Sequence, residues 1–380
     1  MDAAVQIPPP KSAAADAHAA DKRHLYMDAL RLLACFLVIV NHTNSLVFQS
    51  AETTNLTWYV SIAWYYISKI AVAIFVMVGG ACLLPKQDTP KRAAGRIGRL
   101  AAALVVFSYF YYVIRIAETG EWDRALNIPA FLLSIWEKPV TDAFWYLYFY
   151  LGMMVMMPLF QRLAQSLQKG HLLYLMALTI GGGAAWPLLV HYVPDAQLPQ
   201  YFDICIPAVF VGLLFTGHYL HAYVRPKRWH IWVCAAVFLL SVALSVGLTH
   251  AEYYRVASGE KYWFMDERTT PSMTIIVCAV AMMHGMRCVF ETGTAAAQPE
   301  PCKKFGKWFC RWLPELGACA FGVYLLQDRL IAMTRYRLFV PLAMNIQPFI
   351  AGLVWEAVVF AAALPAAMLL RRIPGLRKLL

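Results

Sequence analysis

The sequence predicts an all-α integral membrane protein of about ten transmembrane helices, and three observations lead to this fold class. Of the residues, 60% are hydrophobic and only 14% are charged, whereas an average soluble domain is about a quarter charged. Apolar runs of about 20 residues, the length that crosses a bilayer, recur along almost the whole chain. Short charged or proline-containing stretches separate these runs.

The predicted spans leave two segments outside the bilayer. The segment 124–137 is apolar but too short to cross, so we expect it at the interface or re-entering the bundle. Residues 1–22 show no apolar period and are predicted to form a disordered cytoplasmic tail, which leaves 23–380 as the transmembrane domain. The spans are 25–48, 58–84, 97–116, 143–161, 171–191, 202–222, 229–249, 270–290, 316–334 and 347–370.

Lysine and arginine are concentrated on alternate loops. If the N-terminus is cytoplasmic, the clusters 86–99, 225–228, 303–311 and 371–378 all fall on the cytoplasmic side. This is the asymmetry of the positive-inside rule, and it predicts that both termini are cytoplasmic. The net charge of +11 is then explained by topology and by contact with anionic lipid, and no nucleic-acid partner is expected.

The first span carries ionisable groups, which are costly in hydrocarbon and usually face a functional cavity. Arg31 and His42 are eleven positions apart, which is three helical turns, roughly 20° from the same face and about 16 Å along the axis. Asp28 lies one turn before Arg31 and is placed to pair with it. Two simpler interpretations stay open. Arg31 could reach to lipid phosphates, and His42 could be a polar residue at the outer interface.

The order Asp-x-x-Arg followed by His in this span resembles the first helix of the membrane-bound acyltransferase family 3. The second span is similar to that family's second helix, with Ala73 where the family often has Pro and Gly79 where it usually has Ser. The basic segment that enters the third span is similar to the family's Arg-x-x-Arg element. The residues that match in these two regions are Lys69, Val72, Phe75, Gly80, Arg92, Arg96 and Arg99.

Two later segments extend the resemblance over most of residues 24–334. The span that begins AFWYLYFY resembles the family's Trp-Tyr-Leu…Pro helix through Trp145, Tyr146, Leu147 and Pro158. The stretch FGVYLLQDRL is similar to a Gly-(Ile/Val)-Tyr-Leu-x-His element, although Gln327 replaces the histidine. The resemblance implies an acyltransferase of the bacterial cytoplasmic (inner) membrane that modifies surface polysaccharides, commonly by O-acetylation.

Acyl transfer from a thioester to an alcohol requires a base for the hydroxyl proton and stabilisation of the oxyanion. There is no Gly-x-Ser-x-Gly elbow in the sequence, so a hydrolase-type serine is not indicated. His42 is the candidate base because neutral imidazole accepts a proton near physiological pH, and the resemblance implies the same role. Lys69, deep in its span, is a candidate for stabilising the thioester oxyanion or the acceptor. It could instead pair with a buried acid such as Asp203 or Glu356.

The donor's phosphates require cations, and arginine suits them through bidentate contacts. Arg96 and Arg99 share a helix face near the predicted cytoplasmic boundary, and Arg31 lies at a similar depth. These three form the predicted site for acyl-coenzyme A, with Arg31 also counted among the catalytic residues. Arg96 and Arg99 could alternatively serve topology alone. Trp145 and Tyr146 are candidates for stacking on a sugar, although aromatic belts also explain such residues.

We therefore predict an acyltransferase that moves an acyl group, most simply acetyl, from cytoplasmic acyl-coenzyme A to a sugar hydroxyl. The acceptor is expected to be a cell-surface or lipid-linked glycan, as the resemblance implies, and no metal is expected. Composition and spacing alone also allow a transporter or exporter of a glycan or small anion. Only span 171–191, with its GGGAAWP break, looks like the interrupted helices of transporters. The acyl chain, the acceptor, O- or N-transfer, an acyl-enzyme intermediate and the oligomeric state stay open.

Overall fold

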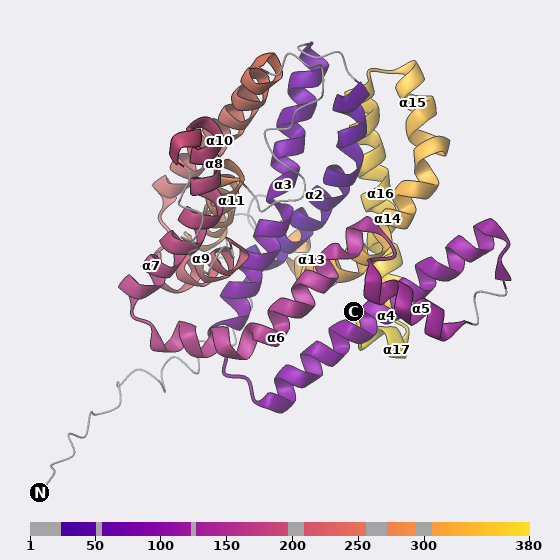
Figure 1. Cartoon of the computed structure of the whole chain (residues 1–380), viewed down its shortest axis with the longest axis horizontal. Helices are drawn as coiled ribbons and strands as arrows, with labels where there is room; N and C mark the ends of the chain where they lie inside the picture. Colours follow the sequence, from indigo (N-terminus) through magenta and orange to yellow (C-terminus); the bar gives the residue numbers. More distant parts are fainter. Residues whose placement is uncertain (1–23, 51–54, 123–126, 197–208, 256–271, 293–305) are drawn as a thin grey trace, which may run out of the picture.

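The computed structural model describes residues 24–50, 55–122, 127–196, 209–255, 272–292 and 306–380, and none of these residues lies in a strand (Figure 1). The long helices are α2 Leu25–Ser50, α3 Leu56–Leu83, α4 Pro90–Thr119, α6 Trp145–Ser166, α10 Arg228–Arg255, α11 Met273–Glu291 and α16 Pro348–Leu370. The shorter helices are α5 Ile128–Glu137, α7 Lys169–Ile180, α8 Trp186–Tyr192, α9 Val209–Tyr223, α13 Gly306–Ala318, α14 Ala320–Thr334, α15 Val340–Asn345 and α17 Pro374–Arg377.

The predicted fold class is confirmed. Within the described residues, eight helices are long and apolar enough to cross a membrane, and a bent pair adds a ninth candidate. The helix α5 has ten residues, so the expectation that 124–137 is too short to span is confirmed. Residues 1–22 lie outside the described part of the chain.

Three predicted spans differ in detail. Span 202–222 is described only from residue 209, as the 15-residue α9. Span 171–191 continues through its glycine run, because Gly181–Ala185 forms a π-helical turn between α7 and α8. Span 316–334 is part of a bent pair, in which Cys310–Ala318 and Ala320–Asn345 meet at 63°. The bend follows a tight turn in which the Cys319 N–H donates to the Leu316 carbonyl, three residues back.

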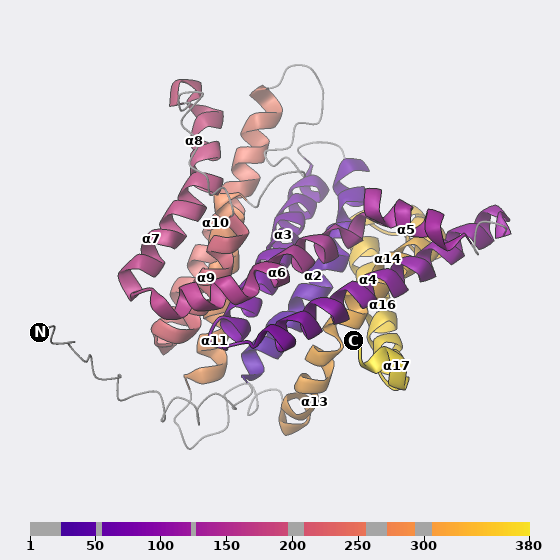
Figure 2. The ribbon, with the colours of Figure 1, turned by 60° about the horizontal axis from the view of Figure 1, so that its bottom comes forward.

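Helices α2 and α3 form the centre of the bundle. They pack along each other, and α2 also contacts α11, α13, α14 and α16, while α3 contacts α9, α10, α11 and α16 (Figures 1 and 2). Trp232 and Leu240 on α10, at the rim, are 79% and 69% exposed. On the central helix α2 the polar side chains of Asp28, Thr43 and Asn44 are buried in protein, whereas the rim helix α10 presents apolar side chains of the kind that face lipid.

Two contacts fix the register of α2 against α3. Arg31 donates to the Cys82 Sγ at 3.2 Å, and the Asn44 side chain donates to the Ser61 carbonyl at 2.6 Å. The helices are therefore antiparallel. Interpolation between the two contacts places Lys69 roughly opposite residue 39, about 4–5 Å along the axis from the level of His42.

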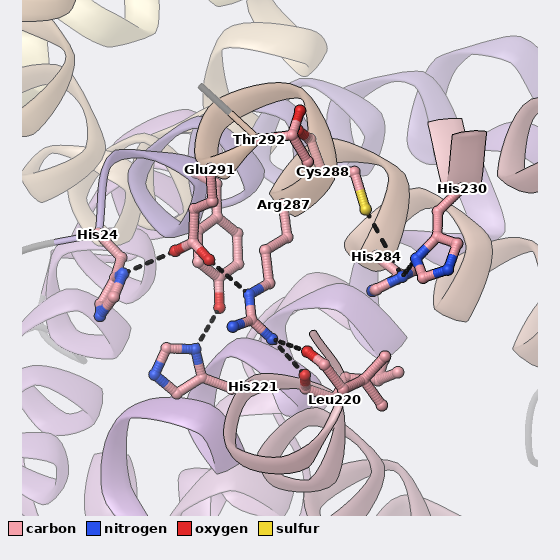
Figure 3. Close-up of polar contacts among 11 residues, drawn as sticks. His24, Leu220, His221, His230, His284, Arg287, Cys288, Glu291 and Thr292 are labelled. Atoms are coloured by element: carbon pink, nitrogen blue, oxygen red, sulfur yellow. Dashed lines mark hydrogen bonds and ion pairs between the residues drawn. The ribbon is translucent and has the colours of Figure 1, made fainter. Parts of the chain in front are cut away.

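A polar network ties the start of α2 to the end of α11 (Figure 3). The His24 Nδ1 lies 2.8 Å from Glu291 Oε1, and the other oxygen of that carboxylate accepts from Arg287 Nε at 2.7 Å. Arg287 also donates to the carbonyls of Leu220 and Val224 near the end of α9. This network joins three helices at one end of the bundle.

Glycine allows α3 and α9 to approach closely. A Cβ at Gly217 would overlap the backbone of Met77, and one at Gly80 would overlap the backbone of Leu214. Small residues at helix contacts are typical of membrane bundles, because they increase van der Waals contact between backbones. Gly247 on α10 differs, since a Cβ there would meet open space.

We predict that Gly217→Ala destabilises the protein by about 1–3 kcal/mol, because the two helices must separate to admit the methyl group. Gly247→Ala is the matched control and should be neutral or slightly stabilising, since alanine favours helix by about 1 kcal/mol over glycine. Thermal unfolding in detergent measures both. Equal stability of the two variants would contradict the close packing of α3 on α9.

Candidate functional site

A cavity of about 430 Å³ lies beside the centre of the bundle, between α2, α3, α4, α6, α13, α14 and the C-terminal end of α16. Four arginines reach it from three elements, α2, α4 and the turn after α16: Arg31, Arg96, Arg99 and Arg371. None of the described residues that line the cavity is acidic. A cavity of this size and charge is suited to an anionic ligand with an apolar part.

Arg31 is held at the cavity by a buried carboxylate. Its guanidinium donates to Asp28 Oδ1 at 3.0 Å, and Asp28 is only 1% exposed. This confirms the predicted pairing. A Cβ at Gly317 on α13 would lie 2.7 Å from the Asp28 Cβ, so α13 can cover the carboxylate only because residue 317 has no side chain. Asp28 therefore lies behind Arg31, which is placed at the cavity wall.

Arg96 is paired with a second acid, Asp88, whose side chain is 6% exposed. Its guanidinium forms an ion pair with Asp88, which also accepts a hydrogen bond from the Gln161 Nε2 of α6 at 2.7 Å. The start of α4 fixes this arrangement, because Thr89 caps the helix and Pro90 opens it. Arg96 and Arg99 then face the cavity, whereas Arg92 is exposed and does not line it.

The cavity has one aromatic wall. Tyr146 and Tyr150, one turn apart on α6, stack at 5.6 Å between ring centroids. Tyr324 of α14 meets Tyr146 edge-on at 5.8 Å, and Phe75 of α3 lies 6.1 Å from it. Tyr146 thus belongs to the arginine cavity. Trp145 does not line it and is 44% exposed, as expected of an aromatic residue at a membrane interface.

The structure brings Arg31, Arg96, Arg99 and Tyr146 together and places His42 and Lys69 elsewhere. His42 and Lys69 do not line the cavity. The side chain of His42 is half-buried three turns further along α2. The Lys69 Nζ lies 4.4 Å above the centre of the Tyr65 ring, a cation–π contact.

A buried carboxylate lies at the same depth in the bundle as His42. Glu356 on α16 is fully buried and accepts from the Thr43 hydroxyl at 3.1 Å and from the Trp64 indole at 3.0 Å. Thr43 is the residue after His42, so a polar layer crosses α2, α3 and α16 at this depth. Asp203, the other candidate partner of Lys69, lies outside the described residues.

Sequence reasoning did not find several residues of the cavity. Arg371 is part of the basic cluster 371–378, which we assigned to topology, and Tyr150 repeats Tyr146 one turn later. The spacing of four residues could have identified Tyr150 as a neighbour of Tyr146 on the same helix face. Asp88 does not line the cavity but holds Arg96. The sequence gives no sign of this role, because the contact of Asp88 with Arg96 depends on how the chain turns between α3 and α4.

The sequence model of an acyltransferase domain, acyltransferase family 3, matches residues 24–372. The chain belongs to this family, and it is therefore an acyltransferase embedded in a membrane. This assignment favours the enzyme over the transporter that composition alone allowed. Neither the search of curated proteins nor the search of solved structures finds a match.

The cavity should be open to small reagents. Cys82 lines it, whereas Cys35 on the neighbouring helix is only 1% exposed. We expect a water-soluble maleimide to modify Cys82 at least about tenfold faster than Cys35 in folded protein, since thiol reactivity requires access. Mass spectrometry of peptides after timed labelling measures both in the same chain. Equal labelling would mean that the cavity is closed in solution.

Proposed function

We propose that this acyltransferase takes an acyl group, acetyl in the first instance, from cytoplasmic acyl-coenzyme A and transfers it to a hydroxyl of a cell-surface or lipid-linked glycan. The observation that carries the proposal is a cavity whose described lining residues include four arginines and no acidic side chain. Coenzyme A has a pyrophosphate and a 3′-phosphate, and planar guanidinium groups bind phosphate oxygens in pairs. The tyrosine wall offers a surface for the apolar parts of the donor.

The distance along α2 between Arg31 and His42 fits an elongated donor. The phosphates would lie among Arg31, Arg96 and Arg99, with the thioester directed toward the layer of His42, about 16 Å further along the axis. In the proposed reaction the hydroxyl proton passes to His42 as the acceptor oxygen attacks the thioester carbon. The C–S bond then breaks, and the coenzyme A thiolate takes a proton from the imidazolium. Lys69, at a similar depth, would stabilise the oxyanion.

The orientation follows from the same proposal. The arginine cavity would open to the cytoplasm of a bacterium, because acyl-coenzyme A is a cytoplasmic metabolite. Both termini would lie on that side, together with the loops that carry the basic clusters. Maleimide applied to inside-out inner-membrane vesicles should therefore reach Cys82. Labelling only from the outside of intact spheroplasts would reverse the orientation.

We predict that the double variant Arg96→Ala, Arg99→Ala weakens binding of acetyl-coenzyme A by at least about tenfold, since each charge-assisted contact contributes roughly 1.5–3 kcal/mol. Arg92→Ala is the matched control, because Arg92 is on the same helix but outside the cavity. Calorimetry in detergent gives the affinities. Unchanged affinity in the double variant would leave these arginines with a topological role only.

We predict that His42→Ala lowers the rate of acyl transfer by about 10²–10⁴, the usual contribution of a general base. Affinity for acetyl-coenzyme A and thermal stability should stay near those of the wild type. His171→Ala, an exposed histidine at the start of α7, is the control.

Thiol release from acetyl-coenzyme A in micelles, with glycan acceptors supplied, measures this rate without any membrane gradient. Thiol release that survives in His42→Ala would show that another group is the base. Release that is absent with every acceptor in the wild type would overturn the transfer itself.

A further inference from the structure

A His-x-x-x-Cys pattern occurs twice, on two helices that pack together. His230 and Cys234 lie one turn apart near the start of α10, and His284 and Cys288 lie one turn apart near the end of α11. Residues four apart share a helix face. Because α10 and α11 pack along each other, the two faces can meet, and none of these four residues belongs to the arginine cavity.

Three of the four side chains converge (Figure 3). The His230 Nδ1 lies 2.9 Å from the His284 Nε2, and the Cys288 Sγ lies 3.5 Å from that same nitrogen. All three atoms lie within 4.8 Å of one another. One ring nitrogen thus faces two polar atoms, and if it carries a proton it can donate fully to only one of them.

The fourth side chain, Cys234, contributes none of the converging atoms, but it packs against Gly285, the residue after His284 on α11. A Cβ at Gly285 would lie 3.2 Å from the Cβ of Cys234 and 4.0 Å from its Sγ. Because residue 285 has no side chain, none stands between Cys234 and this face of α11. Cys234 and Cys288 are both free thiols.

The surroundings of this group are compatible with a bound cation. Cys288 is fully buried, and His284 is 9% exposed, so the converging atoms are largely shielded from water. Arg287, between them in sequence, points away toward Leu220 and Glu291 (Figure 3). Its positive charge is offset by the Glu291 carboxylate at 2.7 Å.

We propose that His230, Cys234, His284 and Cys288 bind one Zn²⁺ ion, which fastens α10 to α11. Zinc takes imidazole and thiolate ligands in a tetrahedral set, whose edges are about 3.3–3.8 Å for Zn–N near 2.0 Å and Zn–S near 2.3 Å. The 3.5 Å contact already matches such an edge, and the 2.9 Å contact needs to open by a few tenths of an ångström. The Cys234 Sγ, which is not among the converging atoms, needs to move toward the ion. A closed set of two histidines and two cysteines is typical of structural zinc.

This proposal departs from the sequence expectation that the protein holds no metal, and it does not depend on the proposed donor or acceptor. Binding would release the two thiol protons, since zinc is bound by thiolate. The ion adds a bond between helices where hydrogen bonds join α11 to α9 and to the start of α2.

The experiment measures zinc in the full-length protein, purified in detergent with a tag that contains no histidine. After incubation with zinc and dialysis, the wild type should retain about one zinc per chain by plasma mass spectrometry. His284→Ala and Cys288→Ala should each lose at least about nine-tenths of it. Cys278→Ser, on the same helix, and His171→Ala are the controls and should retain it.

A second measurement uses the wild type alone, so it does not depend on the folding of a variant. Zinc should slow alkylation of the half-buried Cys234 at least about tenfold, and a chelator should reverse this, whereas Cys82, which lines the arginine cavity, should be unaffected. Zinc retained equally by the wild type and His284→Ala would overturn the proposal. So would alkylation of Cys234 that does not change with zinc.

Discussion

The ion pair of Asp28 with Arg31 is the interaction on which the cavity depends. A guanidinium inside a membrane bundle is costly unless a partner and a protein-lined cavity receive it. Asp28 supplies the partner, and Gly317 lets α13 cover the carboxylate. The same arrangement recurs at Arg96, which is held by Asp88. In both cases the acid lies behind the arginine, so the cavity itself stays cationic and can receive an anion.

Most of the fold follows from the length and apolarity of the segments, because a spanning helix must bury every backbone polar group within itself. The position of each long helix was therefore predictable, as was the short α5. The bend at Cys319 was not, since it depends on one tight turn in an apolar stretch with no distinguishing composition. Nor was the continuity of 171–191, because a run of glycines is equally compatible with a break and with a π-helical turn.

Part of the candidate site was predictable from the spacing and depth of its residues. Arg96 and Arg99 share a face by spacing alone, and Arg31 matches them in depth, so the three could be grouped from sequence. Contacts between distant segments could not be predicted, because they depend on packing. Asp88 reaches Arg96 through the turn between α3 and α4, and Arg371 reaches the cavity from the far end of the chain.

The arrangement of α2 and α3 suggests how the proposed reaction could avoid moving charge across the bilayer. The arginines lie at one end of the antiparallel pair, and His42 and Lys69 lie near one another in depth, about two to three turns away. A donor bound along this pair, as proposed, would keep its phosphates at the arginines, where their charge would be neutralised. Only the thioester end would enter the bundle, and an acetyl group is neutral. Passage of that group to an acceptor on the other side would then cost far less than transport of an ion, which at the bilayer centre costs several kcal/mol.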